Sequence, residues 1–413
     1  MSALRKGWCP SVLRPMASGD GLIVRVSIKD GRVSPTIARA LATLSRRFGN
    51  GLLDLSARAN LQLRGVSDAT LVPLQTELRA LGVAEADGEP AVARNIISHP
   101  LAGIDPQAVV DTGSCVRVLR DRLAQDPIVH QLPQKFGFVI DDGGALSLAN
   151  EKTDVSFLAQ RGADCPRFLI RLAGQIAGEC AIGELADVGL RIAHAFLQLR
   201  DEPAERMAAL VRRVGIEKII ASAGLTQTAL IIENHAPHPI GTYRVGANCV
   251  LGVGIPFGRL DASTLKRLAD LAEASGGEMR LTPWRAILIV GADQPDAARL
   301  SDTGLIFNED DPLRSVAACP GVSGCSSGTT ATHTDARRLA PFARQLHTHG
   351  ISLHVSGCAK GCAHPAAVPF TLVGHDGRYD LVRDGTAADK PIATGLEVHQ
   401  LDLALQQFAE IDA

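Results

Sequence analysis

The sequence predicts an α+β protein in which one structural plan occurs twice. Residues 31–66 match residues 258–292 at single positions and in the order of turn, helix and strands. Self-similarity of this kind indicates an internal duplication. We therefore expect two equivalent halves about a pseudo-two-fold axis, each with a small module followed by a larger α/β module.

Each copy of the small module shows the same succession of elements. An alternating apolar strand comes first, over residues 22–28 or 249–255. After a turn with glycine, Ser34 or Asp261 can cap a helix with apolar residues at three- and four-residue spacing. A glycine ends this helix and a second pair of strands follows. This succession is about half of a ferredoxin-like fold.

The larger modules repeat more weakly. Residues 134–148 and 368–382 each suggest a strand, a tight turn with Asp-Gly and a returning strand. Ligands often bind between such duplicated parts. We predict five parts in chain order: ferredoxin-like half-domain 1–75, larger module 76–205, helical connector 206–237, ferredoxin-like half-domain 238–297 and larger module 298–413.

Composition excludes several classes of protein. A net charge of −2 and an aromatic content of 4% argue against a nucleic-acid-binding surface. No run of about eighteen apolar residues occurs, and the N-terminus lacks an apolar signal-peptide core. We therefore expect a cytoplasmic protein without a membrane span. No G-x-G-x-x-G stretch follows a predicted strand, so we expect no dinucleotide-binding domain.

Four of the nine cysteines form two closely spaced pairs in glycine-rich loops. Five residues separate Cys319 from Cys325, and three separate Cys358 from Cys362. Glycine lets such loops curl tightly, so four thiolates at these spacings can hold one iron–sulfur cluster. A structural zinc ion is an alternative, although zinc sites favour about two to four residues within each pair. Four buried thiols are the other alternative.

These cysteine pairs, in a duplicated chain, resemble those of the sulfite and nitrite reductase superfamily. The resemblance covers nearly the whole chain and implies a sulfite/nitrite reductase-like fold. It implies that Cys319, Cys325, Cys358 and Cys362 hold a 4Fe–4S cluster. In the reductases the last cysteine, here Cys362, also bridges to the iron of a sirohaem.

The same superfamily lines its tetrapyrrole pocket with basic residues, because paired hydrogen bonds from arginine suit the carboxylates of the macrocycle. For Arg25 the alternating apolar neighbours favour a buried position over a solvated one. The second copy has Trp284 and Arg285 at the place of Arg58, as expected if one half keeps the pocket. By resemblance the pocket residues are Arg25, Arg58, Arg94 and Lys135, with Asn60 and Gln62 as additional hydrogen-bonding groups.

One position departs from the reductases. They carry a second lysine, which helps to grip sulfite or nitrite, two places after the position of Lys135; this chain has Gly137. Residues 7–26 and 354–365 instead resemble the precorrin-3B synthases, a family within the superfamily. That resemblance implies a monooxygenase that hydroxylates precorrin-3A at carbon 20 and closes a γ-lactone in aerobic cobalamin biosynthesis. The alternatives are a sirohaem-dependent sulfite or nitrite reductase and a cluster-carrying electron-transfer protein.

The resemblance also implies dioxygen as a substrate, NADH as the ultimate electron source and a separate electron-donor protein. It implies a second iron besides the cluster, either non-haem or of sirohaem type bridged through Cys362. Imidazoles are candidate ligands for a non-haem iron, although a structural or surface histidine is the default; the candidates are His99, His238, His354 and His364. The sequence assigns no catalytic residue. The other cysteines are predicted to be buried thiols, with Cys9 as the first exception.

Overall fold

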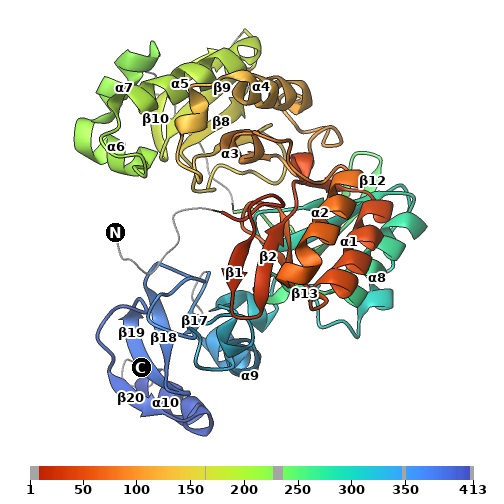
Figure 1. Ribbon diagram of the computed structural model, residues 1–413, viewed down its shortest axis with the longest axis vertical. Coiled ribbons are helices and arrows are strands. Elements are labelled where there is room, and N and C mark those ends of the chain that lie inside the picture. Colours follow the sequence, from red (N-terminus) through yellow and green to blue (C-terminus); the bar gives the residue numbers. More distant parts are fainter. Residues whose placement is uncertain (1–8, 163, 227–235, 347–349, 410–413) are drawn as a thin grey trace.

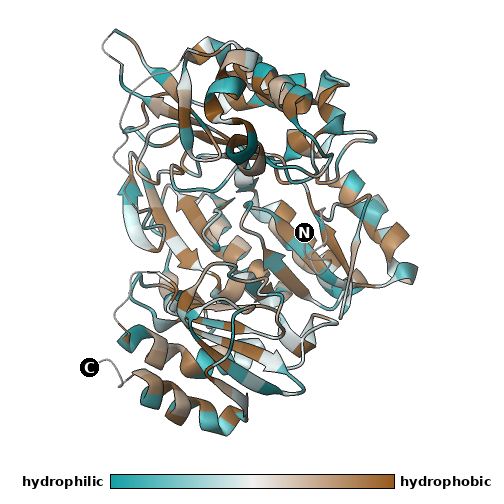
Figure 2. Ribbon diagram, turned by 90° about the vertical axis from the view of Figure 1, so that its left-hand side faces the viewer, coloured by the Kyte–Doolittle hydropathy of each residue, from teal (hydrophilic) through white to brown (hydrophobic). Residues whose placement is uncertain are grey.

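The computed structural model describes residues 9–162, 164–226, 236–346 and 350–409. Over these residues the chain forms four five-stranded sheets. Two of the sheets form a central body with their helices, and the other two form lobes above and below it (Figure 1). The strands of the central body are largely apolar (Figure 2). None of the described helices is both long enough and apolar enough to cross a membrane.

The central body contains the two small modules. The first consists of β1 (Met16–Ser18), β2 (Gly21–Arg25), β3 (Arg32–Val33), α1 (Pro35–Phe48), β4 (Leu52–Leu55), β5 (Leu61–Val66) and α2 (Asp68–Ala80). The second consists of β11 (Gly241–Val245), β12 (Asn248–Gly254), β13 (Arg259–Asp261), α8 (Ala262–Ala274), β14 (Glu278–Leu281) and β15 (Ala286–Gly291). The predicted caps are confirmed: Ser34 accepts from the Ile37 N–H at 3.3 Å and Asp261 from the Thr264 N–H at 2.8 Å.

The two small modules exchange a strand. The sheet orders are β1-β2-β5-β4-β13 and β11-β12-β15-β14-β3, so each sheet ends on a strand of the other copy. β13 pairs antiparallel with β4, and β3 pairs antiparallel with β14. Leu41 of α1 and Leu268 of α8 are fully buried in one core that draws on both modules. The small modules therefore form one folded unit.

A left-handed turn precedes each exchanged strand. Asp30 and Phe257 both have φ of 56°, and each is followed by a glycine with positive φ. A Cβ atom on Gly31 would lie 2.9 Å from the Leu281 carbonyl oxygen, and one on Gly258 would lie 2.7 Å from that of Leu55. Glycine is needed at both places because the exchanged strand passes so close to its partner sheet.

The large modules repeat one sheet topology. In each, three parallel strands are followed by two antiparallel ones. The first contains α3 (Ala91–Arg94), β6 (Ile96–Ser98), α4 (Gly113–Gln125), β7 (Phe138–Asp141), β8 (Val155–Gln160), β9 (Arg167–Leu172), β10 (Gln175–Ala181) and α5 (Leu185–Leu199). The second contains β16 (Val316–Ala318), α9 (Thr332–Gln345), β17 (Leu353–Ser356), β18 (Val368–His375), β19 (Arg378–Gly385), β20 (Ala393–Leu396) and α10 (Leu401–Ala409). This repeat confirms the predicted duplicated fold.

The predicted match between residues 134–148 and 368–382 is wrong. The hairpin of β18 and β19 corresponds to β8 and β9, because these strands hold the same places in their sheets. Residues 134–148 contain β7 alone, and both neighbours of β7 run parallel to it. The Asp-Gly turn folds instead around the Asp141 carboxylate, which accepts from the Gly143 N–H at 3.0 Å.

The segment predicted as a helical connector packs on the first large module. It forms α6 (Met207–Val214) and α7 (Ile216–Ala223). Met207 and Ile219 are fully buried in the apolar core of that module. Residues 227–235 of the predicted connector lie outside the described residues.

Candidate functional site

The four clustered cysteines lie on loops of the second large module. Cys319 directly follows β16, and Cys358 lies two residues beyond β17. These strands are parallel neighbours, with Ala318 opposite Val355, so both loops leave the same edge of the sheet. The Gly357 N–H donates to the Cys319 Sγ at 3.1 Å. Cys319 and Cys358, one from each pair, therefore lie on neighbouring loops that are joined by this hydrogen bond.

Glycines allow these loops to pack backbone against backbone. A Cβ atom on Gly357 would lie 3.2 Å from the Cα atoms of both Gly321 and Gly328, and 3.5 Å from the Cys319 Sγ. Cys319, Cys325 and Cys358 are free thiols. An iron–sulfur cluster is held by cysteine thiolates, and hydrogen bonds from N–H groups to the sulfur atoms tune it. These tight loops supply both kinds of group. The donor set fits a cluster, and the ligand assignment stays a prediction.

A buried arginine of the first small module holds the loop before Cys325. Arg64 is 3% exposed and forms ion pairs with Asp20 at 2.6 Å and Asp54 at 2.9 Å. Its Nη2 also donates to the Gly324 carbonyl oxygen at 2.6 Å. No motif marks Arg64, and the sequence signal is a charge inside a mostly apolar strand. The central body thus fixes one cysteine loop of the lower lobe.

Three of the predicted pocket residues line one small cavity between the first small and first large modules. Its volume is about 20 Å³, room for a single water molecule rather than a macrocycle. The Gln62 amide, with its oxygen turned toward Arg25, accepts from Nε at 2.9 Å and from Nη2 at 2.6 Å. The cavity is lined by Arg25, Asn60 and Arg94 together with Cys9 and Gln134, among others.

Further contacts of the predicted residues join the modules around this cavity. Arg58 Nη2 donates to the Lys135 carbonyl oxygen at 2.7 Å, which joins the small module to the large one. Asn60 shapes the turn: its Nδ2 donates to the Arg58 carbonyl oxygen at 2.8 Å. Arg94 Nη1 lies 3.9 Å from the Glu85 carboxylate, and its buried Nε makes no hydrogen bond to any described residue. The structure therefore groups the predicted basic residues.

A larger pocket opens in the first large module. Its volume of about 520 Å³ lies in the usual range for small-molecule sites. Lys152, Arg171 and Arg206 line it, and sequence reasoning missed all three because isolated basic residues carry no motif. Burial lowers the pKa of Arg58, and the charges of Arg206 and Arg25 lower it further. Arg58 is therefore near both Arg25 of the small cavity and Arg206 of the larger pocket.

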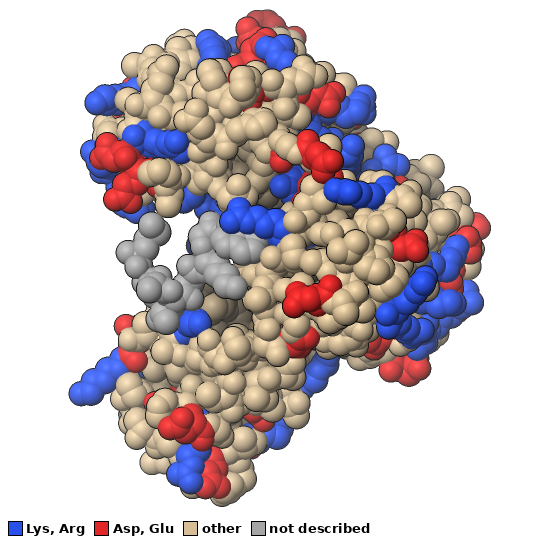
Figure 3. Space-filling model, in the orientation of Figure 1, with Lys and Arg blue, Asp and Glu red and all other residues tan. Residues whose placement is uncertain are grey.

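Two basic residues lie near the histidines beside Cys362. His354 is fully buried on β17, with its ring 6.2 Å from that of His364. Burial lowers the pKa of His364, and the charges of Arg285 and Lys152 lower it further. Lys152 of the upper lobe is therefore close to the loop of the last cysteine pair. Figure 3 shows a hollow between the two lobes with Lys and Arg side chains on its walls.

The other predicted histidines and cysteines differ in their burial. His238 is exposed, 4.0 Å from Glu309, whereas His99 lies in a buried group described below. Cys180 and Cys249 are buried as predicted, but the prediction is wrong for Cys165, which lies exposed in a loop before β9. Cys115 is partly buried, and Cys9 lines the small basic cavity.

Comparisons with known proteins agree with this architecture. The model of the family "Nitrite/Sulfite reductase ferredoxin-like half domain" matches residues 14–81 and 243–303, one stretch in each small module. A precorrin-3B synthase of Sinorhizobium sp is 32% identical over 95% of this chain and 86% of that protein. The chain belongs to the precorrin-3B synthase family. The predicted resemblance to this family is confirmed.

Reductases are more distant relatives of this precorrin-3B synthase family member. Sulfite reductase [ferredoxin] 2 of Mycolicibacterium paratuberculosis is 25% identical over 91% of this chain and 72% of its own length. Ferredoxin–nitrite reductase of Synechococcus elongatus is 25% identical over 91% and 80%. The structure of the Mycobacterium tuberculosis NirA protein superimposes with a TM-score of 0.73 at 21% identity, over 94% of this chain and 81% of that one. This last likeness concerns the fold alone.

Proposed function

We propose that this protein is a precorrin-3B synthase. It hydroxylates precorrin-3A at carbon 20 with one atom of dioxygen, the other leaving as water, and a ring acetate closes the γ-lactone. Membership of the family supports this reaction. The observation that favours it over sulfite or nitrite reduction is the surroundings of Gly137.

Position 137 has no space for the second anion-binding lysine of the reductases. A Cβ atom there would lie 2.7 Å from the Asn95 carbonyl oxygen and 3.1 Å from Arg58 Nη1. The Gly137 N–H donates to Asp154 Oδ2 at 3.1 Å, and its carbonyl oxygen accepts from Thr153 Oγ1 at 2.8 Å. A lysine would require the backbone of residue 95 to move. This packing keeps the second anion-binding lysine out of position 137 and so argues against a small oxyanion as the substrate.

The basic residues supply the binding chemistry of the proposal. Precorrin-3A is a polycarboxylate, and guanidinium groups bind carboxylates through paired, charge-assisted hydrogen bonds. Arg25, Arg58 and Arg94 would hold one side of the macrocycle. Lys152 and Arg206 would extend the contact along the larger pocket. The cavity near Arg25 must widen when the substrate enters, since its volume is about 20 Å³.

The cluster belongs to the same proposal. Cys319, Cys325, Cys358 and Cys362 would hold it, and it would supply the single electrons that dioxygen chemistry requires. A second iron, non-haem or of sirohaem type bridged through Cys362, and a separate donor protein fed by NADH complete the proposed set. The cysteines besides Cys362 are free thiols, in line with a reducing compartment such as the cytoplasm.

The test uses the full chain purified without oxygen. It is incubated with precorrin-3A, then given dioxygen and a reductant, and the product is identified by mass. We expect a product that contains one more oxygen atom than precorrin-3A and a closed γ-lactone ring. Turnover of sulfite or nitrite, together with the absorption bands of sirohaem, would instead establish the reductase alternative.

A further inference from the structure

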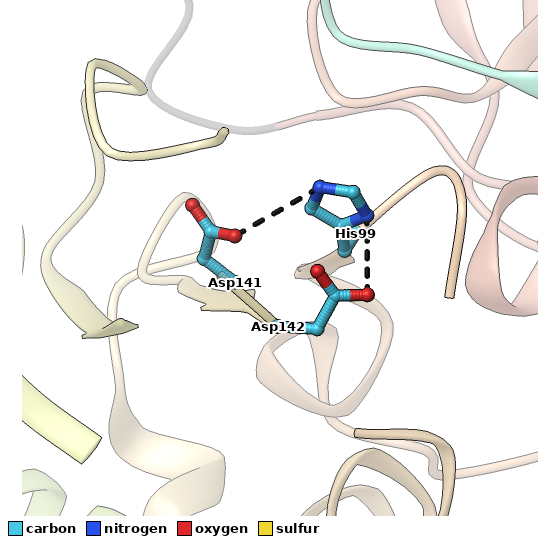
Figure 4. A group of neighbouring side chains, drawn as sticks. All are labelled: His99, Asp141 and Asp142. Atoms are coloured by element: carbon cyan, nitrogen blue, oxygen red, sulfur yellow. Dashed lines mark ion pairs between the residues drawn. The ribbon is translucent and has the colours of Figure 1, made fainter. Parts of the chain in front are cut away.

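A second group of ligand-type side chains lies in the first large module. His99 directly follows β6, while Asp141 ends β7 and Asp142 follows it. β6 and β7 are parallel neighbours, with Ser98 opposite Ile140, so the three side chains meet at one sheet edge. One ring nitrogen of His99 and one oxygen of each aspartate lie within 4.8 Å of one another (Figure 4).

This edge is the counterpart of the cysteine edge in the other half of the duplication. β6 and β7 hold the places in their sheet that β16 and β17 hold in theirs. His99 follows β6 by one residue, as Cys319 follows β16. Asp142 follows β7 by one residue, as Gly357 follows β17. The first half thus carries imidazole and carboxylate groups where the second half carries its cysteine loops.

The group is buried and rich in carboxylates. The side chains of His99, Asp141 and Asp142 are 0%, 3% and 1% exposed. Asp105 is also buried, and its Oδ2 lies beside Gly144, which Asp142 contacts as well. Among the described residues no Lys or Arg forms an ion pair with any of these three aspartates, and His99 is the one basic side chain beside Asp141 and Asp142. One imidazole cannot neutralise three buried carboxylates, which are costly unless a proton or a metal ion neutralises them.

Two atoms in the group lack a hydrogen bond. His99 Nε2 and Asp142 Oδ2 form no hydrogen bond with a described residue, although both are buried. The nearest contact of Asp142 Oδ2 is an ion pair with His99 Nδ1 at 3.2 Å. The outer atoms are held in place: Asp141 Oδ2 accepts from the Leu148 N–H at 2.7 Å and Asp142 Oδ1 from the Gly144 N–H at 2.8 Å. Figure 4 shows the imidazole of His99 lying between the two carboxylates. The outer carboxylate oxygens are thus fixed by backbone N–H groups, while His99 Nε2, 3.9 Å from Asp141 Oδ1, has no hydrogen-bond partner among the described residues.

We propose that His99, Asp141 and Asp142 bind one divalent metal ion, with Asp105 as a further oxygen donor. One imidazole with carboxylate oxygens suits Mn²⁺, Fe²⁺ or Zn²⁺. The ion neutralises the buried carboxylates and joins the ends of β6 and β7. Because the group is closed to solvent, the site is structural and takes no substrate.

The site also lies at a junction between modules. Arg280 of the second small module donates to the Pro100 and Ala102 carbonyl oxygens, at 3.0 and 2.9 Å. These carbonyls belong to the loop that begins at His99. Metal binding would therefore hold the first large module against the central body as well as closing its own sheet edge.

The first test removes and restores the metal in the wild-type full chain. The protein is treated with EDTA, dialysed and reloaded with Mn²⁺ or Zn²⁺, and the bound ion is counted by mass spectrometry or by the Mn²⁺ signal in electron paramagnetic resonance. We expect about one ion per chain to return, with a fall in Tm on chelation that Mn²⁺ or Zn²⁺ reverses. Cluster absorption, recorded in parallel, should stay constant.

The second test compares Asp142→Asn and His99→Asn with Asp111→Asn, an exposed neighbour. The two site variants should take up no Mn²⁺, and their Tm should not respond to chelation, whereas Asp111→Asn should behave as wild type. Failure of the wild-type chain to rebind Mn²⁺ or Zn²⁺ would overturn the proposal. Equal uptake by Asp142→Asn and wild type would overturn it too. If the variants do not fold, the wild-type reloading experiment still decides.

Discussion

At the scale of single residues, position along a strand decides which cysteines are available as ligands. Cys319 and Cys358 come just after two parallel strands, where loops converge. Cys180 and Cys249 lie within strands and are buried in the cores. A thiol inside a core is an apolar group, whereas a thiol at the end of a strand can bind iron.

Replacing a clustered cysteine should remove the cluster. In Cys319→Ser or Cys358→Ser we expect loss of the iron and of the broad visible absorption, because an alcohol is a poor ligand for cluster iron. Iron content and absorption of anaerobically purified protein measure this. Cys165→Ser, a change at an exposed thiol, is the control and should keep both. Wild-type iron content in either ligand variant would refute the assignment.

Arg25 should contribute directly to tetrapyrrole binding. Its guanidinium is held by Gln62 and faces the small cavity. Loss of one charge-assisted interaction should weaken binding of precorrin-3A to Arg25→Ala by roughly ten- to a hundredfold. Fluorescence quenching gives the dissociation constant, and cluster absorption should be unchanged. Arg47→Ala, at an exposed position, serves as the control. An unaltered constant would remove Arg25 from the pocket.

Arg64 should hold the Cys325 loop and the small module together. Arg64→Met leaves Asp20 without its buried ion-pair partner, whereas Asp54 keeps Arg259 at 2.7 Å, and we expect the change to cost about 3–5 kcal/mol of unfolding free energy. The Gly324 carbonyl also loses its donor, so the cluster should be released faster in urea. Urea unfolding and the time course of cluster absorption measure the two effects. If only stability changes, Arg64 does not position the loop.

At the scale of elements, sequence patterns predicted the helices and strands whose formation depends on residues close together in the chain. The helix caps at Ser34 and Asp261 and the alternating strands were predicted from residues a few positions apart. The exchange of β3 and β13 was not predicted, because these strands have two and three residues and pair across the duplication. The basic residues of the larger pocket, such as Lys152 and Arg206, were missed for a related reason: only the fold brings them together.

The caps give a prediction at this scale. Asp261 accepts from the first turn of α8 and also belongs to the exchanged strand β13. Asp261→Ala should lower the free energy of unfolding by about 1 kcal/mol, since the Thr264 N–H loses its acceptor. Chemical denaturation measures the change. Asp261→Asn should recover most of it, and equal losses in both variants would argue against capping as the cause.

At the scale of the whole molecule, the duplication yields one structure rather than two independent halves. The shared core and the exchanged strands make each small module incomplete without the other. The motif-bearing cysteines and the matched arginines could be predicted from sequence. The closeness of Lys152 in the upper lobe to His364 beside the last cysteine pair could not be predicted, since it depends on how the lobes lie against the central body.

The two halves should therefore fail to fold separately. Residues 1–237 alone lack β13 and also lack α8, whose buried residues share one core with those of α1. We therefore expect an aggregate or a strand-exchanged dimer. Co-expression with residues 238–413 should restore a soluble complex. Gel filtration and circular dichroism distinguish these outcomes. A monomeric first half with cooperative unfolding would contradict the prediction.

The exchanged strand β3 must wait during translation until its partner strand β14 has been synthesised. Arg32 contacts Glu278, which is 246 positions later in the chain. At translation rates of about 5–20 residues per second, roughly 10–50 s pass before β14 is made. During that time β3 and the open edge of β4 have no partner, and unpaired edges invite aggregation. The nascent chain should therefore depend on chaperones, and slower elongation should lower its yield.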